Sequence, residues 1–242
     1  MASRKHRVLR RWRFVIALLA LLAVAFALNL IYQIVRKPAE LLFPVSGALS
    51  KTPGETWDQY APLFREYSTA VITPELLAAL AQVEGAGNPV ARTPWRWRAT
   101  HDPRELYRPA SSAVGMYQIT DGTFREAKRY CIRNHVVLEE GCWFNSLYMR
   151  VLPSHAIELT SAYLDRRLSE VLARHRIAAA TLEQKHELAA LIHLCGAGAG
   201  DAYARRGLRL TAAQRCGEHD VRAYLTQVRA MKRVFARLSA LR

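Results

Sequence analysis

One acidic residue, Glu84, stands at the end of an apolar stretch with helical spacing. Its carboxyl group continues a buried stripe, whose members are Leu76, Leu77, Leu80 and Ala81. Gly85, Gly87 and Pro89 predict that the helix ends just past Glu84. A carboxyl group there meets the negative end of the helix dipole, and apolar neighbours deny it water. Both effects favour the protonated form, which a general acid needs before it donates to a leaving sugar oxygen.

A second segment, residues 112–120, reads Ser-Ala-Val-Gly-Met-Tyr-Gln-Ile-Thr and is expected to form one wall of a substrate groove. The substrate-binding candidates in it are Gly115, Met116, Tyr117 and Gln118. Gly115 would let backbone approach the substrate closely, although a plain turn glycine would look the same. Gln118 would bind sugar or orient Glu84, and the alternative is a structural hydrogen bond to the neighbouring loop. One shielded acid beside such a wall is typical of a glycosidase site.

Together the two segments resemble the soluble-lytic-transglycosylase domain, a relative of goose-type lysozyme. That family carries Glu-Ser-x-x-Asn-Pro, then Gly-Ala-x-Gly-Leu-Met-Gln-(Leu/Ile) and a Thr slightly later. Glu84, Asn88 and Pro89 match the first motif. The second motif is matched by Ala113, Gly115, Gln118, Ile119 and Thr123. The resemblance covers roughly residues 70 to 235, and two motifs in the right order are a fairly specific signal.

The chain also departs from the family pattern. Gly85 replaces the Ser expected to help orient the acid, Ser112 replaces the first Gly, and Tyr117 replaces Met. The third motif, Ala-Tyr-Asn-Ala-Gly, corresponds to residues 192–196, where only the Gly remains. Residues 220–225 resemble Glu-Thr-x-x-Tyr-Val, so Tyr224 matches the Tyr that lines the family's active site.

The resemblance implies a peptidoglycan lytic transglycosylase that cleaves the MurNAc-GlcNAc β-1,4 bond and leaves 1,6-anhydro-MurNAc ends. Glu84 would act first as general acid and then as base. The substrate's own hydroxyl attacks within the bound molecule, so a second protein base is dispensable. The partner would be peptidoglycan glycan strands, with no cofactor. No metal is expected either, because no compact Cys/His ligand spacing occurs.

Three other functions remain open. The chain could be a catalytically inactive peptidoglycan-binding scaffold of an envelope machine, as Gly85 and the missing Asn suggest. It could be a lysozyme-like hydrolase with Asp102, Glu105 or Asp121 as second carboxyl, although these acids fit ion pairs and a helix first turn better. The net charge of +15 also permits a DNA-binding membrane protein. The expectation of export argues against a nucleic-acid partner.

The N-terminus predicts a membrane anchor. Residues 1–13 form a basic segment expected in the cytoplasm, and residues 14–35 are uncharged and long enough to cross a bilayer. The positive-inside rule then predicts a single-pass protein of the bacterial inner membrane with a periplasmic catalytic domain. A cleaved signal peptide is the alternative. An envelope-spanning secretion machine is a further candidate partner.

The remaining chain predicts a mainly α, lysozyme-like helical domain over residues 57–242, after a linker over 36–56 rich in Pro, Gly and Ser. Helix-start signals stand at Thr73-Pro74, Thr120, Ser154 and Thr181 with Gln184, and the helix after Thr120 is expected to reach Cys131. A C-terminal helix is expected from Val221 onward. No strand-forming alternation is evident.

Two further features concern the exported domain. An even number of cysteines there predicts disulfides, with nearest-neighbour pairing the simplest of three connectivities. The candidates are Cys131, Cys142, Cys195 and Cys216. The loop after Glu84 is aromatic and cationic, so Trp95 could stack on sugar, although such residues also plug a loop onto a core.

Overall fold

The computed structural model describes residues 2–241, and the side chains of all of these except residues 2–9, 43 and 45. The side chains of Arg4, Lys5 and Arg7, part of the expected basic segment, therefore lie outside the described residues. The chain divides into two compact units. The N-terminal unit holds the chain up to Leu41 together with residues 93–112. The helical unit holds residues 42–92 and 113 onward.

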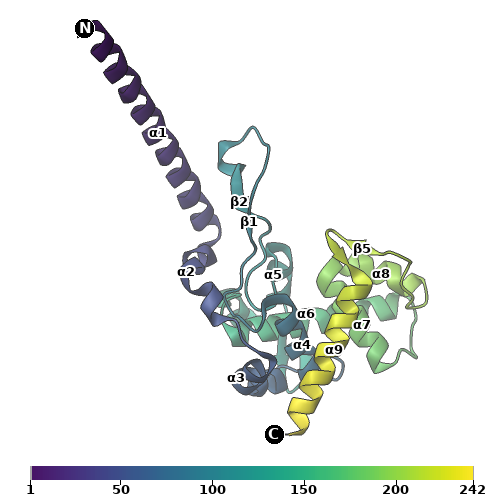
Figure 1. The fold of residues 1–242 in the computed structure, drawn as a ribbon. Helices are drawn as coiled ribbons and strands as arrows, with labels where there is room; N and C mark the ends of the chain where they lie inside the picture. The colour runs from purple at the N-terminus through teal and green to yellow at the C-terminus, as the bar shows by residue number, and fades with distance from the viewer. Residues whose placement is uncertain (1, 242) are drawn as a thin grey trace. The chain divides into compact units, whose positions relative to one another are not determined.

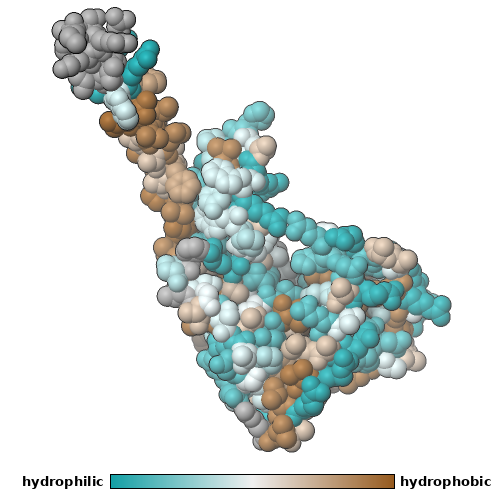
Figure 2. Space-filling model, in the orientation of Figure 1, coloured by the Kyte–Doolittle hydropathy of each residue, from teal (hydrophilic) through white to brown (hydrophobic). Residues whose placement is uncertain are grey.

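The N-terminal unit is built on one long helix, α1 (Ala2–Arg36), followed by the 3-10 turn η1 (Pro38–Leu42). Residues 10–36 of α1 contain an 18-residue stretch with a mean hydropathy of 2.8, and they suffice by length and composition to cross a membrane (Figure 2). Beside α1 runs a hairpin of β1 (Trp95–Trp97) and β2 (Tyr107–Pro109), whose tip contains the 3-10 turn η3 (Pro103–Glu105) (Figure 1).

The helical unit contains the remaining helices (Figure 1). Two short turns open it, α2 (Phe43–Ser46) and η2 (Gly47–Leu49). The longer helices are α3 (Pro53–Glu66), α4 (Pro74–Gly85), α5 (Asp121–Ala127), α6 (Pro153–Arg174), α7 (Leu182–Cys195), α8 (Ala197–Arg205) and α9 (Val221–Ala240). α4 is central, because residues 76–81 are all buried around its circumference. It packs against α3 and α9, and α7 also contacts α9. The prediction of a mainly helical fold with one apolar N-terminal helix is confirmed.

Side-chain caps begin several of these helices where the sequence predicts them. Thr73 accepts a hydrogen bond from the Leu76 amide, and Pro74 occupies the first turn, where its missing N–H costs nothing. Thr181 and Gln184 form the expected reciprocal capping box before α7. Asp220 caps α9 by accepting from the Ala223 amide at 2.8 Å. These local signals fix where α4, α7 and α9 start.

Some expectations about the elements are wrong. The helix after Thr120 ends at Ala127, and Cys131 begins a strand. Leu152, not Ser154, is the cap residue of α6, because Pro153 already takes the first helical position. Short strands also exist. They are the β1–β2 pair, β3 (Cys131–Arg133) with β4 (Val136–Leu138), and β5 (Arg215–Cys216) with β6 (His219–Asp220). None exceeds three residues, which is too short to display a clear alternation.

The boundaries of the expected linker stay a prediction, but its residues are not featureless. Residues 38–49 form the short turns η1, α2 and η2, and α3 already begins at Pro53. Thr52 and Glu55 form a capping box there. The sequence signal for Pro- and Gly-containing linkers therefore overlaps with that of helix starts, in which Pro is also favoured.

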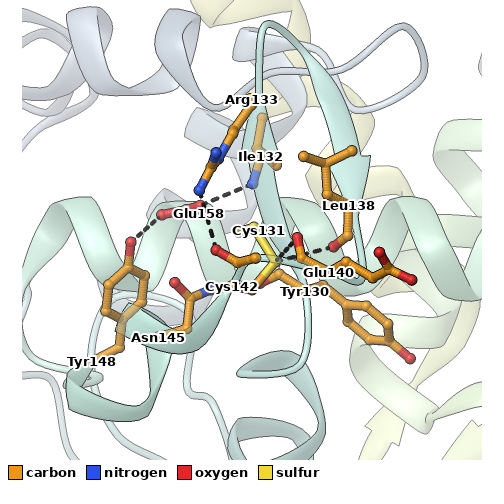
Figure 3. Close-up of a disulfide and its surroundings, with 11 residues drawn as sticks. Tyr130, Cys131, Ile132, Arg133, Leu138, Glu140, Cys142, Asn145, Tyr148 and Glu158 are labelled. Carbon is orange, nitrogen blue, oxygen red and sulfur yellow. Dashed lines mark hydrogen bonds between the residues drawn. A yellow bond between two sulfur atoms is a disulfide. The ribbon is translucent and has the colours of Figure 1, made fainter.

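Both cysteine pairs are joined between nearest neighbours. The Cys131–Cys142 disulfide ties β3 to the turn after β4, with Cα atoms 5.4 Å apart (Figure 3). Beside it, Glu158 of α6 accepts hydrogen bonds from the Ile132 amide and the Tyr148 hydroxyl. The Cys195–Cys216 disulfide ties the last residue of α7 to β5, with Cα atoms 5.6 Å apart. The simplest of the three connectivities is thus the one formed.

Candidate active site

The candidate site forms where α4 ends. Ala86 adopts a left-handed conformation with φ of 50°, and its amide donates to the Gln82 carbonyl. The next amide, that of Gly87, donates to the Ala81 carbonyl at 3.0 Å. These bonds close the last turn and satisfy carbonyls that would otherwise lack partners. Glu84 therefore sits in a rigid final turn, with 16% of its side chain exposed.

Asn88 holds the loop that follows. Its side-chain amide donates to the Ser46 carbonyl, and its Oδ1 accepts from the Val90 amide at 2.9 Å. The residue is buried, and the hydroxyl of Ser46 returns a hydrogen bond to the Val90 carbonyl. Asn88 thus ties the end of α4 to α2, so its contacts are structural.

Gly85 brings the second segment close to α4. A Cβ built on Gly85 would lie 2.8 Å from the Met116 Cα and 2.9 Å from the Met116 carbonyl oxygen. Real Cβ atoms do not approach backbone so closely, so the Ser of the family pattern would not fit here without a shift. Gly85 is therefore a position where α4 and the wall pack closely. The loss of the Ser hydroxyl is only one consequence of having glycine here, and the close packing is the other.

The wall itself is held by its own backbone. Gly115 has a φ of 82°, and its amide donates to the Ala91 carbonyl at 2.8 Å. A Cβ there would meet the backbone of Arg150 and Pro89. Gln118 donates from its side-chain amide to the Ala91 and Gly115 carbonyls, at 3.1 and 2.8 Å. The structural hydrogen bond considered for Gln118 is thus present.

Met116 and Tyr117 point into the core, since neither side chain is exposed. Burial raises the pKa of Tyr117 well above its ordinary value. Its hydroxyl has no hydrogen-bond partner among the described residues, and its ring meets the His193 ring edge-on with centroids 6.4 Å apart. In this packing both side chains lie behind the wall. Direct contact of either side chain with a substrate stays a prediction.

Two side chains from distant elements converge on the Glu84 carboxyl. The Tyr224 hydroxyl, in the first turn of α9, donates to Glu84 Oε1 at 2.6 Å. His193, in the last turn of α7, places Nε2 3.7 Å from the same oxygen, with 9% of its side chain exposed. Glu84 Oε2 accepts no hydrogen bond from the described residues. One carboxyl oxygen is therefore held by a hydrogen bond, and the other is not.

Tyr224 stays a hydrogen-bond donor at neutral pH. Burial, then the charge of Glu84 and the hydrogen bond to it, raise the pKa of Tyr224 well above 10.0. Only 7% of the residue is exposed, so water does not compete for the bond. Sequence reasoning missed His193 as a site residue. The sequence feature that could have identified His193 is its position in residues 192–196, the segment that resembles the family's third motif.

Trp95 belongs to the other unit. Its indole N–H donates to Glu40 Oε2 at 2.8 Å, and its ring packs on Tyr107 with centroids 5.1 Å apart. Contact of Trp95 with a substrate stays a prediction.

The acids considered as a second carboxyl are all engaged elsewhere. Asp102 pairs with Arg104 at 3.0 Å, and Glu105 pairs with Arg36 at 2.7 Å and Arg108 at 2.6 Å. Asp121 pairs with Arg150 at 2.8 Å and is 60% exposed in the first turn of α5. Within the described part of the chain, no cluster of three or more His, Cys, Asp or Glu residues could hold a metal ion.

One protein-family model matches this chain. Residues 63–184, about half of the chain, match the model described as the transglycosylase SLT domain. The match includes Glu84, Gly115 and Gln118, and ends before His193 and Tyr224. The comparisons found no match among curated proteins and none among solved structures. With its acid-bearing helix, glycine wall and mainly helical fold, the chain belongs to the transglycosylase SLT domain family.

Proposed function

We propose that this protein is a membrane-anchored peptidoglycan lytic transglycosylase in which Glu84 serves as general acid and then as base. The observation that carries the proposal is the arrangement of the Glu84 carboxyl. Tyr224 holds Oε1 through a 2.6 Å hydrogen bond, while Oε2 accepts none from the described residues. A carboxyl group fixed at one oxygen can present the other to a single atom of a bound glycan.

The reaction would run in two steps at that oxygen. Protonated Glu84 gives its proton to the oxygen that links MurNAc to GlcNAc, and the bond from this oxygen to C1 of MurNAc breaks. The substrate's N-acetyl oxygen stabilises the positive charge that develops at C1. Glu84, now a carboxylate, takes the proton of the MurNAc C6 hydroxyl, whose oxygen bonds to C1 and closes the 1,6-anhydro ring. Glu84 ends as it began, protonated, and no water is consumed.

This mechanism needs one well-placed carboxyl group and not two. Asp102, Glu105 and Asp121 all form ion pairs with arginines, which supports a one-carboxyl site. His193 Nε2 lies beyond ordinary hydrogen-bond distance of Oε1. We therefore assign His193 a positioning role, in which its ring fills the space between Glu84 and Tyr117.

The wall formed by residues 113–118 would line the groove mainly with backbone. Gly115 and Gln118 fix its course through bonds to Ala91, and Met116 and Tyr117 support it from the core side. Trp95 remains a candidate for contact with a sugar ring. Next to Glu84, the glycan would then be recognised mainly by backbone groups of this wall.

The place of action would be the periplasmic face of the bacterial inner membrane. α1 is long and apolar enough to cross a bilayer, and the basic residues that precede it favour a cytoplasmic N-terminus. A retained anchor would confine the enzyme to glycan strands near the membrane. A secretion machine as partner stays a prediction.

The test is product analysis in water labelled with heavy oxygen. Purified sacculi are digested with the full-length protein in mild detergent, and the soluble fragments are weighed by mass spectrometry. A transglycosylase releases anhydro ends that carry no label. Labelled reducing ends would instead show a hydrolase with a second carboxylate.

The alternative to an enzyme is a non-catalytic peptidoglycan-binding module, and one residue supports it. Leu194 stands where the family's third motif has Asn, so the polar side chain of that motif is absent here. In the same digestion, such a module would remain bound to sedimented sacculi and release no fragments.

A further inference from the structure

The segment of residues 205–222, from the last residue of α8 to the first turn of α9, is strongly cationic, and we call it the arginine loop. It contains five arginines against two acids, Glu218 and Asp220. The arginines are Arg205, Arg206, Arg209, Arg215 and Arg222. Asp220 is already used as the cap of α9, where it accepts a hydrogen bond from the Ala223 amide at 2.8 Å. The loop therefore carries a surplus of positive charge.

Two of these arginines hold the loop in shape. Arg206 donates to the Arg209 carbonyl at 3.2 Å and to the Gln214 side-chain oxygen at 3.3 Å. Arg215 donates at 2.6 Å to a carbonyl in the turn between β5 and β6. The Val221 amide donates to the Gln214 carbonyl at 3.0 Å, which returns the chain to the start of α9. The end of α8, β5 and the start of α9 therefore lie together (Figure 1).

The other three arginines are free to bind a ligand. Arg205, Arg209 and Arg222 are exposed, and their guanidinium groups form no ion pair or hydrogen bond with any residue that the structure describes. Arg174 of α6, by contrast, pairs with Asp201 at 2.7 Å. Like charges held close together repel one another, and a bound anion relieves that repulsion. The arginine loop therefore offers three guanidinium groups to an anionic ligand.

The arginine loop lies against the candidate active site. A disulfide from Cys216 to Cys195 fixes it to the last residue of α7. Cys216 Sγ also lies 3.5 Å from the Leu194 carbonyl oxygen, in the segment that resembles the family's third motif. At its other end the loop runs directly into the turn of α9 that carries Tyr224, the donor to Glu84. A glycan held at Glu84 would therefore have the loop beside it.

The charge on such a glycan comes from its peptide branches. The N-acetylated sugars are uncharged, whereas the peptides attached to MurNAc carry free carboxylates. A guanidinium group matches a carboxylate through two parallel hydrogen bonds. Leu194 stands where the family's third motif has its polar Asn, so the loop can supply polar recognition that this segment lacks. Nucleic acids and lipid headgroups are anionic too, but binding at Glu84 would bring neither of them to the loop.

We propose that the arginine loop binds the carboxylates of the substrate's peptide branches, and that the protein prefers glycan strands whose branches are anionic. The inference rests on the proposed function, because it takes peptidoglycan as the ligand. Arg205, Arg209 and Arg222 supply the cations, while Arg206 and Arg215 keep the loop in place. The wall then binds the sugar chain, and the arginine loop binds the charge of the peptides.

Affinities for two matched ligands test the proposal. Peptide-bearing glycan strands are compared with the same strands after their peptide carboxylates have been converted to amides, which removes the charge and keeps the size. The full-length Glu84→Gln protein in mild detergent is titrated with each, and fluorescence anisotropy of end-labelled strands gives the affinity. The anionic strands should bind about 2- to 30-fold more tightly, the range expected of two exposed ion pairs. Equal affinities would overturn the proposal.

A pair of double variants tests the assignment to the loop. Arg209→Gln with Arg222→Gln should abolish most of the preference and leave the affinity for amidated strands unchanged. The control is Arg233→Gln with Arg237→Gln, which removes the same charge from exposed residues farther along α9 and should keep the preference. An equal loss in both double variants would reveal a general effect of net charge and overturn the assignment.

A lipid partner gives a different result. In that case the loop variant would keep its preference for anionic strands but lose binding to phosphatidylglycerol vesicles, and the proposal would be overturned. None of these measurements uses glycan cleavage. Failure of the proposed transglycosylase reaction, which the analysis of digestion products detects, is therefore a separate result.

Discussion

The Tyr224 hydroxyl donates a 2.6 Å hydrogen bond to Glu84 Oε1 across 140 residues of sequence. The bond joins the last turn of α4 to the first turn of α9, two helices that pack against each other. Because both ends are fixed by capped helix termini, the carboxyl group is oriented before any substrate arrives. That preorganisation is the physical basis of the proposed catalysis.

Removing this hydrogen bond should slow cleavage without unfolding the protein. Tyr224→Phe keeps the buried ring but loses the hydroxyl that orients the Glu84 carboxyl group, a hydrogen bond that contributes about 0.5–1.5 kcal/mol. The rate of muropeptide release should fall about 2- to 13-fold. The matched control is Tyr203→Phe. This variant loses the 3.0 Å hydrogen bond from the Tyr203 hydroxyl to Glu187, which does not involve Glu84. A rate loss equal in both variants would contradict the special role of Tyr224.

Adding a side chain at Gly85 should lower the stability of this protein. Gly85→Ser adds the family's residue, but its Cβ would meet the Met116 backbone at 2.8 Å. We expect a loss of about 1–3 kcal/mol of stability, read as a lower Tm in thermal unfolding. Gly122→Ala is the control, because nothing lies within 4 Å of its added Cβ and the residue is in α5. That variant should be stabilised, by about 0.5–1 kcal/mol.

The two disulfides should differ in what their loss affects. Replacing Cys131 and Cys142 by Ala opens a loop of 11-residue separation and should cost about 3 kcal/mol of stability. Replacing Cys195 and Cys216 should cost a similar amount and also slow cleavage, because this bond joins the α7 end that carries His193 to β5, just before α9. Thermal unfolding and initial rates below the Tm separate the two effects. Equal rates in both double variants would contradict this assignment.

His186 should make the fold sensitive to mild acid. It is 5% exposed, and burial, with Lys232, lowers its pKa from 6.5 to about 4. Glu183, the Val71 backbone and Glu75 oppose that shift. Below pH 6.5 the unfolded chain binds a proton that the folded chain refuses, so stability falls as pH drops from about 6.5 to 4.

Replacing His186 by an apolar residue tests that dependence. His186→Leu should flatten the decline in unfolding free energy between pH 7 and pH 4.5 by roughly 2–3 kcal/mol relative to wild type, as denaturant titrations at each pH would measure. An unchanged pH dependence in the variant would contradict the assignment.

The sequence predicted those features whose signals are local. Thr73-Pro74 and the pair Thr181 and Gln184 marked helix starts because caps act within one turn. The apolar N-terminal helix follows from an uncharged stretch long enough to be read directly. The hairpin at Trp95 was missed because three-residue strands carry too little periodicity.

Features that depend on tertiary packing were harder to predict. The proximity of His193 to Glu84 joins residues far apart in sequence, and only the resemblance of residues 192–196 to the family's third motif pointed to it. The clash that forbids a side chain at Gly85 likewise depends on where residue 116 lies. The resemblance supplied Tyr224 as a candidate, whereas the hydrogen bond that connects it to Glu84 required the fold.

The most direct test of the account is the activity of Glu84→Gln beside wild type on purified sacculi. Gln keeps the shape and can accept the Tyr224 hydrogen bond, but it can neither donate the catalytic proton nor take one back. We predict anhydro-muropeptides from wild type and none above background from Glu84→Gln, with the two proteins equal in Tm and in binding to sacculi. Anhydro products from Glu84→Gln at the wild-type rate would contradict the central claim.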